Sequence, residues 1–180
     1  MNVCVFCGSG SGFNPAYSEA ARKLGVLLAD ASVRLIYGGG NIGLMGTVAD
    51  AVMGAGGKVT GVIPAFLLEK EVGHRGITDL EVVESMHQRK QRMADLADAF
   101  VALPGGWGTL EELSEILTWK QLGLISQPIA ILNTDRFFDP LLDQMRLMVK
   151  EGFLKSGYFS ALHVESDPEK LLSLLIAQKA

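Results

Sequence analysis

The sequence contains few of the residues that build metal sites and disulfide frameworks, with only two cysteines and three histidines among 180 residues. His74, His87 and His163 do not fall at metal-ligand spacing from either cysteine, so we expect no metal ion. The cysteines form Cys4-x-x-Cys7 at a short apolar run that predicts a strand. Because residues three apart on a strand point to opposite faces, we expect a buried thiol and one at the strand end, not a redox pair.

An excess of positive charge is also absent. The net charge is −4, which gives no electrostatic footprint for a nucleic acid. No apolar run approaches the roughly 18 residues that a membrane-spanning helix needs. Residues 1–8 lack the basic segment and the long apolar core of a signal peptide. We therefore expect a cytoplasmic protein with a single domain, residues 1–180, and with neither a nucleic-acid nor a membrane partner.

Short apolar runs alternate with segments of helical periodicity along the whole chain, and predict strands and helices respectively. The mixed segment 65–79 predicts a lid or loop, and Asp139, followed by Pro140, is the expected N-cap of a late helix. The alternation is typical of an α/β three-layer sandwich, in which helices cover both faces of a mostly parallel sheet. The expected strands are 3–6, 33–37, 58–63, 80–83, 99–103, 129–132 and 162–164, and the expected helices include 15–31, 85–98 and 168–177.

Three glycine-rich loops follow predicted strands, at 7–12, 38–46 and 104–108. Ligands of parallel sheets bind at the carboxyl ends of the strands, so these loops are expected to converge on one site. In the third loop, Pro104-Gly105-Gly106-Trp107-Gly108, the backbone can turn its N–H groups inward, and the next helix adds its positive end. Together the loops predict a site for a ligand that carries a phosphate.

Two common classes of nucleotide site do not fit. Gly38-x-Gly40-x-x-Gly43 matches the dinucleotide fingerprint, but it follows the second predicted strand, and the next strand offers no acid for the ribose hydroxyls. The chain also has no Gly-x-x-x-x-Gly-Lys-Ser/Thr phosphate loop. The sequence therefore predicts neither NAD binding nor ATP hydrolysis of the P-loop kind.

Thr109 and Glu112, directly after the third loop, have two interpretations. Thr-x-x-Glu before an apolar run is a capping box, with Thr109 as the N-cap and Glu112 reaching back to it. Alternatively, Glu112 is a catalytic carboxylate beside the phosphate. The neighbouring Glu111 weakens the capping interpretation, because one carboxylate is enough for a cap.

Arg89 also has two interpretations. At 100° per residue it falls inside the apolar stripe of the predicted helix 85–98, and Lys90 lies on the same side. An arginine stem can cover apolar surface while its head stays in solvent. Alternatively, the helix holds a permanent cation over the cleft, where a guanidinium can bind phosphate oxygens or balance developing charge.

The segments 38–46, 86–90 and 104–112 together resemble the LONELY GUY (LOG) family of cytokinin riboside 5′-monophosphate phosphoribohydrolases. The resemblance implies a Rossmann-like fold, a homodimer and no cofactor. It also implies a nucleoside 5′-monophosphate substrate, whose N-glycosidic bond is hydrolysed to give a free base and ribose 5-phosphate. Some members carry an older lysine decarboxylase label, but nothing in the sequence argues for a pyridoxal lysine.

The resemblance makes Arg89 and Glu112 the catalytic pair, with Glu112 beside an oxocarbenium-like centre and Arg89 balancing charge as the base leaves. Trp107 stands where tyrosine is common in the family, and Glu71 lies in a segment, 68–77, that departs from the plant-type members. A nucleotide carrier without turnover is the alternative, since a carrier needs the glycines but not both members of the pair. The expected substrate contacts are Glu71, Met86, Lys90, Gly105, Gly106, Trp107, Gly108, Thr109, Leu110, Glu111 and Thr118, with Ser9, Gly39, Gly40 and Gly43 from the other two loops.

Overall fold

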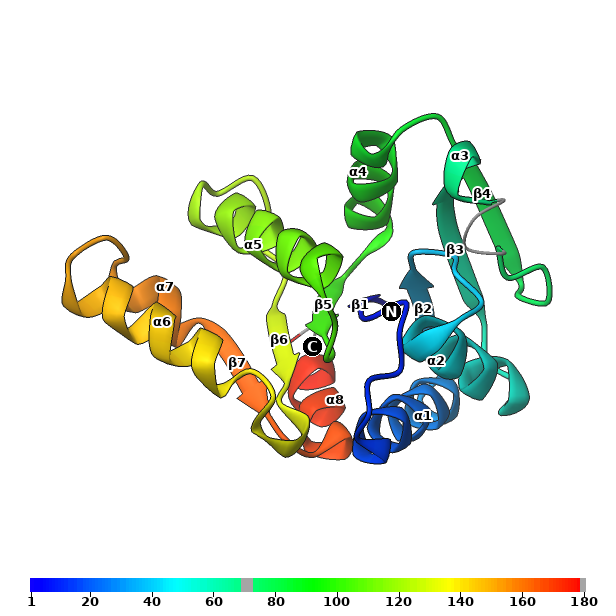
Figure 1. Ribbon diagram of the computed structural model, residues 1–180, viewed down its shortest axis with the longest axis horizontal. Helices are drawn as coiled ribbons and strands as arrows, with labels where there is room; N and C mark the ends of the chain where they lie inside the picture. The colour runs from blue at the N-terminus through cyan, green and yellow to red at the C-terminus, as the bar shows by residue number, and fades with distance from the viewer. Residues whose placement is uncertain (69–72, 179–180) are drawn as a thin grey trace.

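A computed structural model describes residues 1–68 and 73–178 of the chain, and these form a seven-stranded sheet flanked by helices (Figure 1). The strands are β1 (Asn2–Phe6), β2 (Arg34–Tyr37), β3 (Val59–Pro64), β4 (Asp79–Val83), β5 (Ala99–Ala102), β6 (Ile129–Leu132) and β7 (Leu162–Glu165). The helices are α1 (Pro15–Asp30), α2 (Gly43–Gly54), α3 (Ala65–Leu68), α4 (Met86–Leu96), α5 (Trp107–Gln121), α6 (Asp139–Lys150), α7 (Ser156–Ser160) and α8 (Pro168–Ala177), with a 3-10 turn, η1, at Thr134–Arg136.

The sheet order is β4-β3-β2-β1-β5-β6-β7, and the neighbouring strands pair in parallel. The chain winds outward from β1 to β4 and then returns to the other side of β1 with β5. The β1–β5 boundary is therefore the switch point, at which open parallel sheets bind their ligands. Every pairing between the described strands is parallel, so the Rossmann-like α/β prediction is confirmed.

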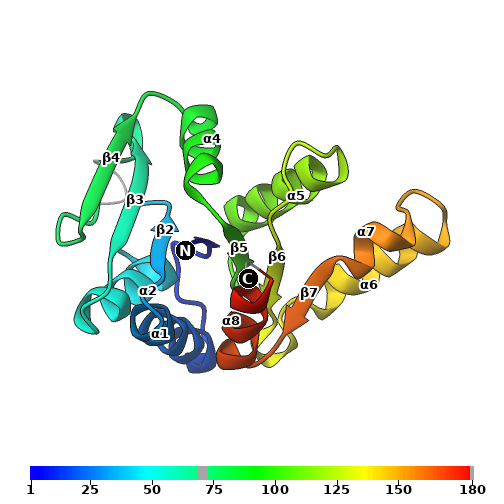
Figure 2. The same ribbon diagram turned by 180° about the vertical axis from the view of Figure 1, so that it is seen from behind.

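Two hydrophobic layers cover the faces of the sheet. One is built from inward residues of α1, α2 and α8 against one face. The other is built from α4, α5 and α6 against the opposite face. Figures 1 and 2 show this three-layer arrangement from both sides. The loops at the carboxyl ends of the central strands lie between the two layers of helices.

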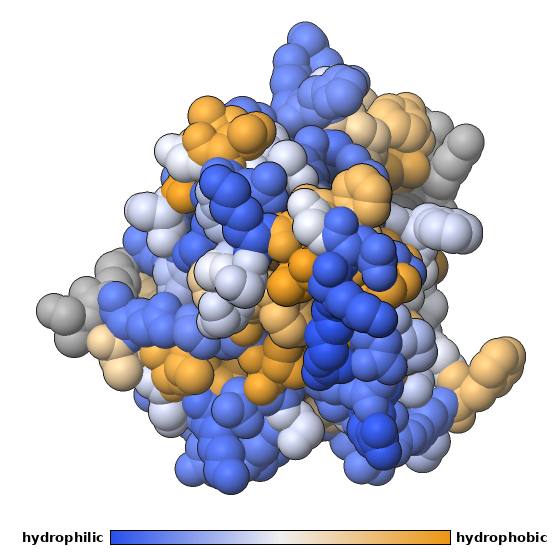
Figure 3. All heavy atoms as spheres, turned by 90° about the vertical axis from the view of Figure 1, so that its left-hand side faces the viewer, coloured by the Kyte–Doolittle hydropathy of each residue, from blue (hydrophilic) through white to orange (hydrophobic). Residues whose placement is uncertain are grey.

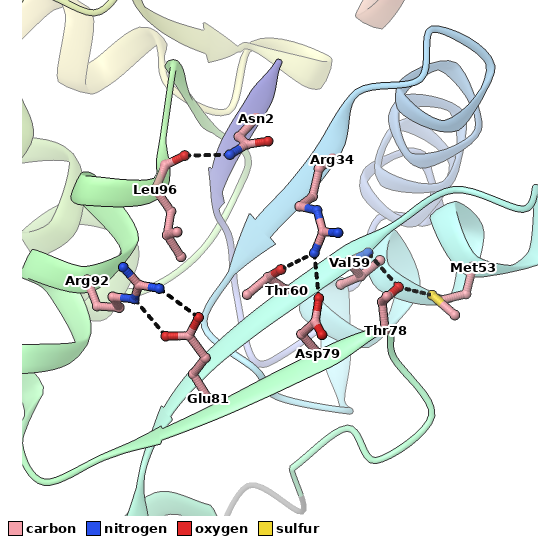
Figure 4. Close-up of polar contacts among 10 residues, drawn as sticks. All are labelled: Asn2, Arg34, Met53, Val59, Thr60, Thr78, Asp79, Glu81, Arg92 and Leu96. Atoms are coloured by element: carbon pink, nitrogen blue, oxygen red, sulfur yellow. Dashed lines mark hydrogen bonds and ion pairs between the residues drawn. The ribbon is translucent and has the colours of Figure 1, made fainter.

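The segment 65–79, predicted as a lid or loop, is partly helix and strand. The segment 65–79 begins with the short helix α3, Gly73 bridges Gly40, and the last residue already belongs to β4. The edge strand β4 is held by Arg34, whose guanidinium donates to Thr60 Oγ1 at 2.7 Å and to Asp79 Oδ2 at 2.5 Å (Figure 4). Strand β4 covers Asp79–Val83 and pairs with β3, so the predicted strand at 80–83 is confirmed.

The prediction that Asp139 caps α6 is wrong by one residue. Phe138 is the N-cap and makes no side-chain capping bond, and Asp139 is the first residue of the helix. The Asp139 carboxylate instead accepts hydrogen bonds from Asn133 at 2.8 Å and Arg136 at 2.6 Å. Its side chain therefore stabilises the turn before the helix.

The two cysteines face opposite sides of the sheet, as the strand spacing predicts. Cys4 packs in the layer of α4 to α6, and Cys7 in the layer of α1, α2 and α8. Both thiols are free and buried. Burial raises the pKa of each thiol, the Glu112 carboxylate raises it further, and Arg89 opposes this. Both are therefore protonated at neutral pH, and the structural interpretation is confirmed.

Candidate functional site

A cavity of about 170 Å³ lies at the carboxyl ends of β1 and β2, beside the start of α5. It is therefore next to the switch point of the sheet. Side chains and backbone from β1, the loops after β1 and β2, and helices α2, α4 and α5 contribute to it. Its lining residues are Val5, Cys7, Gly8, Ser9, Gly38, Met45, Arg89, Gly106, Trp107, Gly108, Thr109 and Glu112.

Arg89 is held in this cavity by backbone carbonyl groups. It lies in the first turn of α4, whose N-cap Ser85 accepts a hydrogen bond from the backbone N–H of Gln88. The residue is only 6% exposed. Its Nε donates to Val62 O at 3.1 Å, and a terminal nitrogen donates to Gly38 O at 2.8 Å. The interpretation as a solvated rim residue is therefore wrong, because the guanidinium is fixed at the ends of β2 and β3.

The first turn of α5 forms the opposite wall. Its N-cap is Gly106, with no side-chain capping bond, and Thr109 is a buried residue inside the helix. The capping-box interpretation of Thr109 is therefore wrong. The helix begins three residues earlier than that box requires. Its positive end therefore lies beside the cavity, which Gly106, Trp107 and Gly108 line. Glu112 follows less than two turns later and lines the same cavity.

Neighbouring protein atoms require glycine at Gly38 and Gly105, but not at Gly106 and Gly108. A Cβ at Gly38 would lie 1.8 Å from the Arg89 guanidinium, and one at Gly105 would lie 2.1 Å from Thr109 Oγ1. At Gly106 and Gly108 a Cβ would meet nothing within 4 Å, although both residues line the cavity. The first two glycines therefore allow close packing, whereas the packing of the protein does not demand glycine at the other two positions.

The structure brings part of the predicted site together. Ser9, Arg89, Gly106, Trp107, Gly108, Thr109 and Glu112 line the cavity, and Gly105 lines an adjoining cavity of about 340 Å³ that shares Gly8, Ser9 and Gly106. Glu71 lies outside the described residues. Met86, Lys90, Leu110, Glu111, Thr118, Gly39, Gly40 and Gly43 are not among the lining residues.

Several of these residues have other contacts. Thr118 lines an apolar groove among α5, α6 and α7 instead. Lys90 donates to Glu111 and Glu115 on α5 rather than entering the cavity. A Cβ at Gly39 would point at Ile63 and Leu80.

Five lining residues are not among the predicted substrate contacts: Val5, Cys7, Gly8, Gly38 and Met45. Gly8 and Gly38 belong to glycine-rich loops that the sequence predicts at this edge. The sequence therefore indicates the loops, but not which of their residues line the cavity. Val5 and Met45 are apolar residues of a strand and a helix, and nothing in their spacing separates them from core residues. Cys7 was assigned to the strand end, and that position places it in the wall of the cavity.

The chain is similar to proteins of a known family. A family model described as possible lysine decarboxylase matches residues 45–175. The cytokinin riboside 5′-monophosphate phosphoribohydrolase LOG of Oryza sativa subsp. japonica is 49% identical over 152 residues, which are 84% of this chain and 63% of the rice protein. The cytokinin riboside 5′-monophosphate phosphoribohydrolase of Rhodococcoides fascians is 44% identical over 175 residues, which are 97% of this chain and 88% of that one. The chain belongs to the LOG family.

The chain thus spans less than two thirds of the rice LOG protein. Among solved structures, the molybdenum cofactor binding protein of Rippkaea orientalis superimposes with a TM-score of 0.75 at 22% identity, covering 99% of this chain and 97% of that one. This likeness shows the shared fold. None of the described residues that line the LOG cavity is a lysine, the residue that a pyridoxal Schiff base requires. Residues 1–68 and 73–178 also include no helix with the length and apolar character that a bilayer crossing demands.

Proposed function

We propose that this chain hydrolyses the N-glycosidic bond of an adenosine 5′-monophosphate, with or without an N6 substituent, to release the free base and ribose 5-phosphate. With a prenyl group at N6 the released base is a cytokinin. The observation that carries the proposal is that Arg89 and Glu112 line one cavity beside the start of α5. The names of the LOG relatives, at 44% to 49% identity, support the same reaction.

The phosphate docks at the start of α5, against the backbone from Gly106 to Thr109. N–H groups there have no intrahelical partner, and the helix end favours an anion. At about 170 Å³ the cavity is smaller than the roughly 300 Å³ or more that a whole small-molecule ligand occupies. It therefore holds the sugar and phosphate, and the base extends toward Trp107, which is 88% exposed at the same cavity.

Glu112 and Arg89 act on opposite charges during cleavage. Bond breaking gives the sugar an oxocarbenium-like character, which the Glu112 carboxylate stabilises. The same carboxylate orients or deprotonates the attacking water. The guanidinium of Arg89, fixed by two carbonyl groups, holds the substrate and balances negative charge as the base leaves.

Incubation with AMP and with a prenylated AMP, followed by chromatography of the free base, tests this function. We expect both the wild-type protein and Glu112→Gln to bind AMP by calorimetry. Base release by Glu112→Gln is expected to fall by at least about 100-fold, because the variant keeps the shape of the side chain and loses its charge. Wild-type protein that binds AMP and yields no base would instead be a nucleotide carrier.

We also propose that the protein is a homodimer in the cytoplasm. The family resemblance supports the dimer, and so does an apolar groove of about 300 Å³ among α5, α6 and α7. Figure 3 looks onto the side of the molecule where α6 and α7 lie and shows hydrophobic patches there among hydrophilic side chains. Sedimentation of the purified protein at micromolar concentration tests the dimer.

A further inference from the structure

Lys90 links two helices through its ammonium group. It follows Arg89 on α4, and its side chain is only 9% exposed. Its ammonium group donates to Glu111 and, at 3.1 Å, to Glu115 Oε1, both on α5. Burial lowers the pKa of Lys90, but hydrogen bonds to the two carboxylates outweigh this and raise the pKa above its ordinary value. Lys90 therefore remains a cation throughout the neutral range.

This link spans the two helices that supply the reacting groups. Helix α4 carries Arg89, which is anchored to β3 through Val62 O. Helix α5 carries Glu112 and starts just after β5. Arg89 and Glu112 are thus held by separately anchored elements. Each is the immediate chain neighbour of a residue in the Lys90 link.

We propose that Lys90, with Glu111 and Glu115, is a clamp that sets the placement of Arg89 relative to Glu112. In this role Lys90 is a positioning residue and not a substrate contact. The inference rests on the proposed function of Arg89 and Glu112. A misplacement of about 1 Å between reacting groups can cost about 100-fold in rate. The phosphate site is formed by backbone at the start of α5, so the clamp is expected to affect turnover more than substrate binding.

The test compares Lys90→Met, Lys90→Arg and the double variant Glu111→Gln/Glu115→Gln. Lys90→Met keeps an apolar stem and removes the charge. We expect kcat for AMP to fall by about 10-fold to 100-fold, while KM changes by less than about twofold. Lys90→Arg keeps a cation that can reach both carboxylates, and is expected to restore kcat. The double variant removes both carboxylates and is expected to lower kcat as Lys90→Met does.

Glu81→Gln is the matched control. It removes the partner of Arg92, whose Nε and terminal nitrogen donate to Glu81 at 2.7 and 3.0 Å (Figure 4). That pair also holds α4, but it ties the helix to β4 rather than to α5. We expect Glu81→Gln to leave kcat and KM unchanged, and thermal melting of every variant reports changes in stability.

Several results would overturn the clamp. A Lys90→Met variant with raised KM and unchanged kcat would make Lys90 a substrate contact. A lower Tm with unchanged kcat in that variant would leave it a purely structural role. If the wild-type protein releases no base, the proposed function fails, and amide hydrogen exchange over Met86–Leu96 decides the clamp. Faster exchange in Lys90→Met would then support it, and unchanged exchange would overturn it.

Discussion

At the scale of single residues, a methyl group at Gly108, which lines the cavity, would meet no protein atom within 4 Å. Alanine also favours a helix over glycine by roughly 0.5–1 kcal/mol. We therefore expect Gly108→Ala to keep or raise Tm while weakening AMP binding by about 10-fold or more, since about 1.4 kcal/mol of lost contact is tenfold. Calorimetric titration and thermal melting measure the two effects. Gly54→Ala in α2, where a Cβ also meets open space, is the control that leaves AMP binding unchanged.

At the scale of the elements, the structural features that can be predicted from the sequence are those that depend on residues close together along the chain. Three patterns suffice to place the site at one edge of the sheet: strands that alternate with helices, helical periodicity, and glycine-rich loops that follow strands. The N-cap of α5 was not predictable in this way, because Thr109 satisfies the capping pattern and Gly106 does not. A helical wheel places Lys90 on the same side of the helix as Arg89. Its hydrogen bonds to Glu111 and Glu115 could not be predicted, because they depend on how α5 packs against α4.

Side chains of β1 alternate between the two faces of the sheet, and this has a chemical consequence for the two thiols. Burial raises the pKa of Cys4 and Cys7, and the nearby Glu112 carboxylate adds to this. The thiolate is the nucleophile in disulfide exchange, so both side chains are expected to be inert in the folded protein. Titration with a chromogenic aromatic disulfide at pH 8 is expected to detect no thiol before unfolding and both thiols in guanidinium. Prompt reaction of one thiol in the native protein would contradict the assigned environment.

At the scale of the whole molecule, the face formed by α6 and α7 is the best candidate for contact with a second copy of the chain. Phe153, between these helices, is 86% exposed and lines the apolar groove. Exposed apolar patches of this kind mark interaction surfaces (Figure 3). Phe153→Asp would bury a charge in such an interface, so we expect sedimentation to show a monomer at a concentration where the wild type is a dimer. Phe13→Asp alters a still more exposed phenylalanine just before α1 and is expected to leave the dimer intact. A dimer that survives Phe153→Asp would place the interface on another face.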